Sequence, residues 1–232
     1  MGFSQILGLI PQALWESVYM TVLTTVFAYI IGLPLGLVLV VTGKDGIRPM
    51  RGLNAALGAV VNFLRSVPFL ILLFFLNPFT RWVVGTTVGS PATIVPLVIS
   101  AFPFVARMVE SSAKEVDRGV IEASLSMGAS GWQIVTKVIL PEAGPGLING
   151  AALSATTILG YSAMASINGG GGLGAIAINY GHYRQNYEVM FIMMVVLVLL
   201  VQVIQESGTR VSRLSDKVGG QAVLGRQGSL TT

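Results

Sequence analysis

Long apolar segments separated by short polar ones run through most of the chain. The first, between residues 17 and 43, contains no acidic or basic side chain, and four more cover about 57–79, 92–109, 145–167 and 189–205. Each approaches the length of about 20 mostly apolar residues that a membrane-spanning helix needs. The pattern therefore predicts an all-α integral membrane protein with five transmembrane helices within residues 1–217.

The composition supports this prediction and argues against several other classes of protein. Charged residues make up 10% of the 232 residues, whereas a soluble domain has about 25%. Cysteine is absent, which excludes disulfides and thiolate metal sites. His182 is the single histidine, so we expect no metal site. In a membrane protein the net charge of +4 indicates orientation and lipid contact rather than a nucleic-acid partner.

The basic residues are distributed unevenly between the two sides of the predicted helices. Two lie on one side (Arg81 and Arg184), Arg65 lies inside the second segment, and the other eleven of the 14 lie on the opposite side, namely Lys44, Arg48, Arg51, Arg107, Lys114, Arg118, Lys137, Arg210, Arg213, Lys217 and Arg226. Because basic residues concentrate on the cytoplasmic side, the N-terminus is predicted outside and the C-terminus in the cytoplasm. Residues 218–232 lack periodicity and are predicted to be a disordered cytoplasmic tail.

The arginine inside the second segment has two interpretations. Arg65 lies within about two turns of the cytoplasmic end of the segment 57–79, so its side chain could reach the interface by snorkelling. Alternatively, Arg65 lines the inner mouth of a pathway through the membrane. The sequence leaves both interpretations open.

The cytoplasmic segment 119–141 is polar, but it carries the pattern of two short helices. The first is predicted over 119–127 and is interrupted by Gly128. Ser130 and Gln133 then have the spacing of a capping box, which starts a second helix.

Apolar residues on the second short helix indicate that it packs against something. Trp132, Val135 and Ile139 are predicted to share one face, and Pro141 is predicted to end the helix. One interpretation is a helix that lies on the lipid headgroups. The other is a rigid element that docks on a soluble partner, which the bend at Gly128 and the scarcity of basic residues favour.

This segment resembles the cytoplasmic signature of the permeases of binding-protein-dependent ABC importers. That signature is Glu-Ala-Ala, three residues, Gly, nine residues, Ile, one residue and Leu-Pro; the two departures in this chain, serine for alanine and valine for isoleucine, are mild. The matching residues are Glu122, Ala123, Ser124, Gly128, Val138, Leu140 and Pro141. The resemblance implies that the bent helix docks in a groove of an ATP-hydrolysing subunit, with Glu122 as the polar anchor, Gly128 as the bend and Pro141 as the stop.

Most of the chain is similar to the methionine-importer branch of this family. The similarity rests on "IGLPLG", "NFLRSVPFLILL", "NPFTRWVVGTTVG", "IVPLVISAFPFVARMVE", "GYSAM" and "GGGGLGAIAINYGHYRQN", which occur in this order. It implies a type I ABC importer permease fold in a bacterial inner membrane. The implied partners are a second copy of the chain, two ABC ATPase subunits and a periplasmic lipoprotein that delivers L-methionine, with D-methionine as a further candidate.

The same resemblance assigns energy supply to the partner. The chain has no G-x-x-x-x-G-K-[ST] phosphate-binding loop, so we expect no catalytic residue and no cofactor on it, with ATP and Mg²⁺ bound by the ATPase. A stand-alone secondary transporter is a less favoured alternative, because none of the five predicted segments contains a carboxylate.

Polar residues in the fourth segment are candidates for a translocation pathway. Methionine is a zwitterion with an apolar, polarisable tail, so its pathway requires polar groups beside soft apolar surface. We predict Tyr161, Ser162 and Met164 as gate residues, together with Arg65. These residues are also compatible with another small amino acid or a betaine-type solute.

Overall fold

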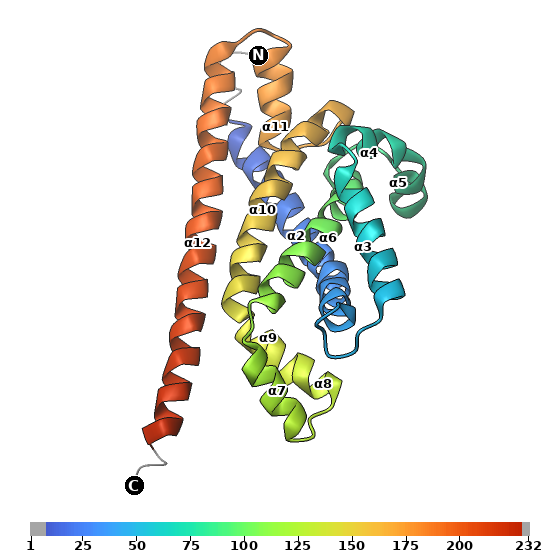
Figure 1. Ribbon diagram of the computed structural model, residues 1–232. Helices are drawn as coiled ribbons and strands as arrows, with labels where there is room; N and C mark the ends of the chain where they lie inside the picture. Colours follow the sequence, from blue (N-terminus) through green and yellow to red (C-terminus); the bar gives the residue numbers. More distant parts are fainter. Residues whose placement is uncertain (1–7, 229–232) are drawn as a thin grey trace.

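The computed structural model describes residues 8–228, with side chains through Ser215, and every regular element in that part is helical (Figure 1). The longer helices are α2 (Ile10–Thr42), α3 (Arg51–Ser66), α4 (Phe69–Phe75), α5 (Asn77–Val84), α6 (Ser90–Lys114), α7 (Arg118–Ser126), α10 (Gly144–Ala165) and α12 (Tyr187–Gly228). The shorter elements are α8 (Gly131–Ile134), the π-turn η1 (Val135–Ile139), α9 (Leu140–Glu142), the 3₁₀ turn η2 (Ser166–Asn168), α11 (Leu173–Ile176) and the π-turn η3 (Ala177–His182).

The number of membrane crossings in the described part agrees with the five predicted. Helices α2, α6, α10 and α12 are each long and apolar enough to cross a membrane, and α3 with α4 qualifies as a bent pair. The N-terminal end of α2, α5 and α11 lie toward one end of the molecule, whereas α7, α8 and the C-terminal end of α12 lie toward the other (Figure 1). This arrangement is what an odd number of crossings requires.

The second crossing is broken, and its prediction as one helix over 57–79 was wrong. Helices α3 and α4 meet at an angle of 97°. Pro68 holds Val67 in an extended conformation, with φ −76° and ψ 124°, because the proline ring collides with a preceding residue in the helical conformation. The break therefore places the C-terminal end of α3 inside the membrane region.

Three helices extend beyond the predicted boundaries in ways that affect the interpretation. Helix α2 has 33 residues, about 50 Å at 1.5 Å per residue, which exceeds a hydrocarbon core of about 30 Å. Because α2, α6 and α12 are longer than predicted, Glu16 lies within α2, Glu110 within α6, and Glu188 and Glu206 within α12. The predicted segments contain no carboxylate, but the longer helices of the structure do.

Helix α12 continues to Gly228 and so enters the segment 218–232, for which the sequence predicts a disordered tail. Residues 229–232 lie outside the described residues, and the disorder of the tail stays a prediction.

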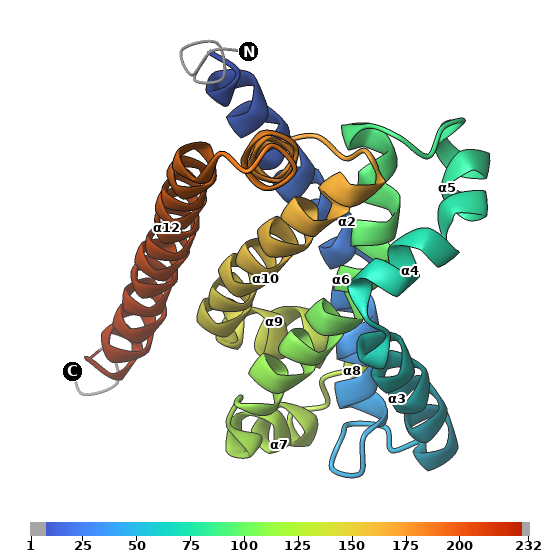
Figure 2. The same ribbon diagram turned by 90° about the horizontal axis from the view of Figure 1, so that it is seen from above.

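The centre of the bundle is a close crossing of α2 and α6. A Cβ atom added at Gly36 would lie 2.5 Å from the carbonyl oxygen of Ala106, and one added at Gly32 would lie 2.7 Å from Val105. Two glycines four residues apart therefore let the backbones approach. Helix α10 packs on both α2 and α6, and α12 packs on the outer side of α10 (Figure 2).

The glycine-rich loop after α10 is a turn fastened to α2. Gly169 and Gly172 have φ values of +79° and +90°, which glycine adopts without strain. Glu16 accepts a hydrogen bond from the Gly172 N–H at 2.9 Å, and the Ser17 hydroxyl accepts one from the Leu173 N–H at 2.9 Å. These bonds hold α11 against the N-terminal part of α2.

Candidate functional site

The segment 119–141, which the sequence predicts to be cytoplasmic, includes helix α7 and bends at a glycine, as predicted. Gly128 has φ +82°. Its N–H donates to the Leu125 carbonyl at 2.9 Å, and the Ala129 N–H donates to the Ser124 carbonyl at 3.1 Å. These two bonds form a Schellman motif, in which the residue at the position of Gly128 must adopt the left-handed conformation. The shape of the bend is thus defined by backbone hydrogen bonds.

The capping box that starts the second short helix is confirmed. The Ser130 N–H donates to Oε1 of Gln133 at 2.8 Å, and the Gln133 N–H donates to Oγ of Ser130 at 3.3 Å. Both bonds satisfy donors that would otherwise remain unpaired at a helix start.

Pro141 does not end the helix, contrary to the prediction. The chain widens into the π-turn η1, where the Leu140 N–H donates to the Val135 carbonyl five residues earlier. In an α-helix the ring of Pro141 would collide with the carbonyl four residues before it, and the wide turn moves that carbonyl away. The Ala143 N–H then donates to the Ile139 carbonyl at 2.8 Å, so the helical path continues into α10.

The π-turn also changes which side chains are buried. Ile134, Val135 and Ile139 pack with Ala113 and other apolar residues at the ends of α2 and α6. The sequence pattern placed Trp132 on this face, and that prediction was wrong. Trp132 is 77% exposed. An α-helical register no longer holds across the extra residue of the π-turn, which rotates the start of the helix relative to Ile139.

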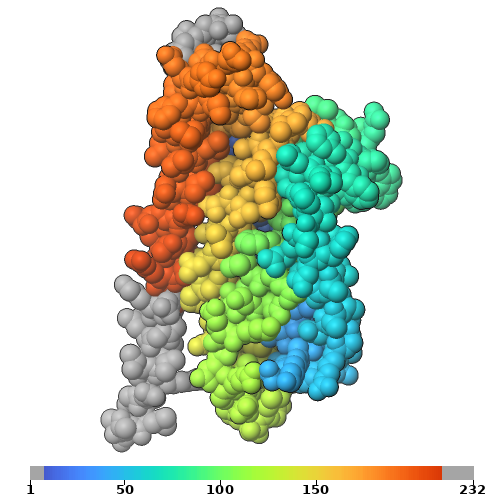
Figure 3. All heavy atoms as spheres, turned by 45° about the horizontal axis from the view of Figure 1, so that its top comes forward, coloured from blue at the N-terminus to red at the C-terminus, as the bar shows by residue number. Residues whose placement is uncertain are grey.

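The short helices of this segment project from one end of the molecule (Figure 3), and exposed apolar side chains gather at this tip. Met127 is 81% exposed, and the other large apolar side chains exposed there are Val120, Leu125 and Trp132. Such a concentration at the aqueous end of a membrane protein indicates a surface that a partner covers. The sequence alone could not identify it, because the same residues also fit a buried helix face.

The residues of the family signature divide between this exposed tip and the interior. Glu122, Ala123, Gly128 and Pro141 are exposed, and Val138 and Leu140 are half-buried. Ser124 is buried and its hydroxyl donates to the Val120 carbonyl at 2.8 Å. The signature has alanine at the position of Ser124. Serine is tolerated at this buried position because its hydroxyl is hydrogen-bonded.

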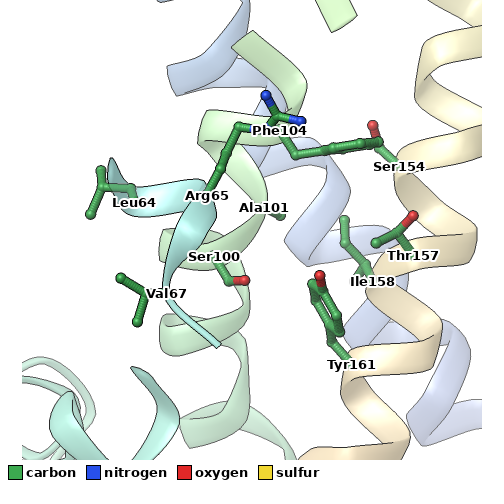
Figure 4. A pocket seen from close by; sticks show the side chains of 10 residues that line it. All are labelled: Leu64, Arg65, Val67, Ser100, Ala101, Phe104, Ser154, Thr157, Ile158 and Tyr161. Carbon is green, nitrogen blue, oxygen red and sulfur yellow. The ribbon is translucent and has the colours of Figure 1, made fainter. Parts of the chain in front are cut away.

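A small cavity lies between α3, α6 and α10 (Figure 4). It has a volume of about 150 Å³, and its polar lining comes from Arg65, Ser100, Ser154, Thr157 and Tyr161. The side chains of Arg65 and Tyr161 point into the space between α3 and α10 (Figure 4). Two of the four residues predicted for the pathway are thus brought together from different helices.

The other two predicted residues do not line this cavity. Ser162 is buried, and its hydroxyl donates to the Leu159 carbonyl at 2.8 Å. Met164 is 47% exposed on the open face of α10. Tyr161 stacks on Phe69 of α4, with 4.9 Å between ring centroids, so the break after α3 also positions the tyrosine.

Arg65 lies at the C-terminal end of α3. The helix runs from Arg51 to Ser66, so Arg65 is fourteen residues, or about 21 Å, from the beginning of the helix and one residue from its end, next to the break at Pro68. Snorkelling to the interface and a place in a pathway both stay predictions for this side chain.

Helices α3 and α6 are joined by a charged cluster. Nη2 of Arg107 donates to the Gly58 carbonyl at 3.1 Å and to Oδ1 of Asn62 at 2.9 Å. The same arginine and Lys114 both pair with the buried carboxylate of Glu110. These contacts fix α3 against the end of α6 that leads into α7.

Comparison with known proteins places these features in a family. Residues 32–207, which include the cytoplasmic segment and the cavity, match the model of the binding-protein-dependent transport system inner membrane component. The chain belongs to this family. It is a multi-pass transport permease, and the permease component is separate from the ATPase, so the chain is not an enzyme.

Individual members of the permease family align over most of the chain. One, named "Probable D-methionine transport system permease protein MetI" from Vibrio cholerae, is 46% identical over 208 residues, covering 90% of this chain and 92% of that protein. Another, "D-methionine transport system permease protein MetI" from Escherichia coli K12, is 49% identical over 156 residues, covering 67% of this chain and 72% of that protein.

Solved structures confirm the predicted type I ABC importer permease fold. A chain from the MetNI methionine ABC transporter in an inward-facing conformation superposes with a TM-score of 0.90 at 46% identity, covering 93% of this permease and 99% of that chain. An amino acid ABC transporter solved with histidines gives a TM-score of 0.74 at 18% identity. The second similarity concerns the fold alone.

Proposed function

We propose that this permease forms the translocation pathway of an ATP-driven methionine importer. The similar proteins from Vibrio cholerae and Escherichia coli carry the name of a D-methionine system, and the similar structure is a methionine transporter. Both enantiomers are candidate substrates, and another small amino acid or a betaine-type solute is the alternative. The chain works as a homodimer with two ABC ATPase subunits and a periplasmic lipoprotein that delivers the substrate.

The observation that carries the proposal is the continuous helical connection between the tip and the cavity. The exposed tip around Gly128 is joined through η1 and α9 to α10 without a flexible linker. Helix α10 supplies Ser154, Thr157 and Tyr161 to the cavity. A displacement applied to the tip therefore moves one wall of the cavity as a rigid body, which is the coupling that an ATP-driven importer needs.

The ATPase supplies that displacement in this proposal. Its ATP and Mg²⁺ are bound by the ATPase subunits, and this chain holds no cofactor. Glu122, Ala123 and Gly128 lie at the docking surface, where Glu122 is the charged anchor. The tip faces the cytoplasm and the glycine-rich loop faces the periplasm of a bacterial inner membrane, as the distribution of basic residues indicates.

Two neighbouring threonines offer a matched test of the pathway. Thr156 and Thr157 each donate to the Leu153 carbonyl at 2.9 Å, but of the two only Thr157 lines the cavity. We expect Thr157→Leu to reduce ATP-dependent methionine uptake by about tenfold or more in proteoliposomes that contain the full transporter. Thr156→Leu loses the same hydrogen bond and should retain uptake within about threefold.

The wild-type measurement tests the substrate. Uptake of labelled methionine that requires ATP, the ATPase and the delivery protein supports the proposal. Absence of methionine uptake, with uptake of a betaine or another amino acid by the same vesicles, would show that the substrate is different. Equal uptake by both threonine variants would remove the cavity from the pathway.

A further inference from the structure

Arg65 is a charged side chain inside a membrane-crossing pair of helices, and among the described residues it forms no salt bridge. An intramembrane arginine is costly unless an anion or water satisfies it, and it marks a functional site by default. Glu110 lies in the neighbouring helix α6, but its carboxylate is already paired with Arg107 and Lys114. The guanidinium at the cavity is therefore available to a ligand.

The other acidic residues of the chain lie near the ends of the crossing helices or outside them. Glu16 and Glu188 are at the outer ends of α2 and α12, and Glu206 pairs with Arg210. A second copy of the chain carries the same acidic residues at the same depths, so it cannot bring a carboxylate to the level of Arg65 through a symmetric contact. The anion that Arg65 meets comes from outside the permease.

The hydroxyl groups of the cavity are not equivalent. Ser154 donates to the Gly150 carbonyl at 2.7 Å, and Thr157 donates to the Leu153 carbonyl at 2.9 Å. Their hydrogens are used within α10, which leaves only oxygen lone pairs for a ligand. The Tyr161 hydroxyl forms no intramolecular hydrogen bond among the described residues, so it can donate to a ligand.

We infer that Arg65 and Tyr161 form a transient site for the carboxylate of the transported amino acid. Arginine offers paired N–H donors that match the two oxygens of a carboxylate, and the stacked Phe69 fixes the tyrosine ring. The inference rests on the proposed function, because it deepens the description of the same pathway.

The cavity treats the two charged ends of an amino acid differently. Its lining contains one cation and no carboxylate, so a ligand ammonium group meets no negative charge there, only hydroxyl oxygens such as those of Ser100, Ser154 and Thr157. The apolar lining residues, Leu64, Val67, Phe104 and Ile158 among them, suit an apolar side chain. The carboxylate should therefore be the group that decides binding, and the ammonium group should contribute little.

Three ligands test this asymmetry on the purified permease–ATPase complex without the delivery protein. Ligand-observed NMR titrations would compare methionine, methioninol, which lacks the carboxylate, and N-acetylmethionine, which lacks the ammonium charge. We expect N-acetylmethionine to bind within about threefold of methionine and methioninol to bind at least about tenfold more weakly.

Variants of the two residues complete the test. Arg65→Gln should weaken methionine and N-acetylmethionine by about tenfold or more while leaving methioninol unchanged. Arg65→Lys should restore part of the loss, and Tyr161→Phe should weaken the two carboxylate ligands by about threefold to tenfold. Arg81→Gln, which removes an exposed arginine of α5, is the control and should have no effect.

The outcomes separate this inference from the proposed function. Wild-type methionine uptake decides the function, whereas the titrations decide the site. No saturable methionine binding to the wild-type complex, equal binding of methioninol, or unchanged binding by both Arg65→Gln and Tyr161→Phe would each overturn the inference while uptake stays intact. If Arg65→Gln does not assemble, Arg65→Lys and Tyr161→Phe supply the same comparison.

Discussion

Replacing Gly128 with valine tests whether the shape of the bend controls docking on the ATPase. A Cβ atom at this position meets nothing within 4 Å, so the substitution creates no collision, but the residue has φ +82°. The left-handed conformation costs an L-residue about 1–2 kcal/mol, and a β-branched residue is least suited to it. If the backbone instead relaxes, the two hydrogen bonds of the Schellman motif are lost, at about 0.5–1.5 kcal/mol each.

The strained conformation reduces the equilibrium constant for the docking-competent bend by about 5–30-fold, and the loss of both hydrogen bonds reduces it by about 5–150-fold. The apparent affinity for the ATPase should fall by up to the same factor. The assay is a titration of the ATPase subunit against tagged permease in detergent, with retention as the readout. Membrane insertion should be unchanged, because Gly128 lies outside the crossing helices.

Asparagine at the same position is the matched control. It adds a side chain of similar size but tolerates the left-handed conformation, so Gly128→Asn should retain the ATPase within about threefold of the wild type. Wild-type retention by Gly128→Val would refute the argument. Equal impairment of the valine and asparagine variants would show that side-chain bulk, and not backbone conformation, limits docking.

Two further predictions concern the tip and the orientation of the chain. Trp132 is 77% exposed, so Trp132→Ala should change the free energy of unfolding by no more than about 0.5 kcal/mol. The same variant should weaken binding of the ATPase by about 2–4 kcal/mol, and normal retention of the ATPase would indicate that the tryptophan faces lipid. Since the chain has no cysteine, a single introduced cysteine reports which side of the membrane it faces. With a membrane-impermeant maleimide, Thr86→Cys should react in intact cells and Ser126→Cys only after permeabilisation. The reverse result would invert the proposed topology.

Local residue patterns were sufficient to predict the features that neighbouring residues determine. The number of crossings follows from apolar segments, whose transfer into lipid depends on composition and length. The bend at Gly128 and the capping box of Ser130 and Gln133 involve residues only a few positions apart. The signature around Glu122 is a pattern of fixed spacings, and the family that it indicated is confirmed, while the docking role of its residues stays a prediction.

The sequence could not determine features that depend on how distant segments pack. A proline at position 68 is incompatible with an undisturbed helix in any context, but the 97° angle depends on the packing of α3 and α4 against α6. The break also leaves Arg65 at the C-terminal end of α3. Likewise, a proline at position 141 is compatible with the end of a helix and with a π-turn, so the sequence does not distinguish them. The packing of Ile139 against residues of α2 and α6 favours the π-turn.

The cavity is the clearest case of this division. Arg65 and Tyr161 are separated by almost a hundred residues, and each is compatible with a lipid-facing or a buried position when its own segment is considered. Only the packing of α3, α6 and α10 turns both side chains toward one space. The sequence determined which chemical groups are available to the pathway, whereas the tertiary structure decided which of them meet, because a side chain's direction depends on the helix that covers its other face.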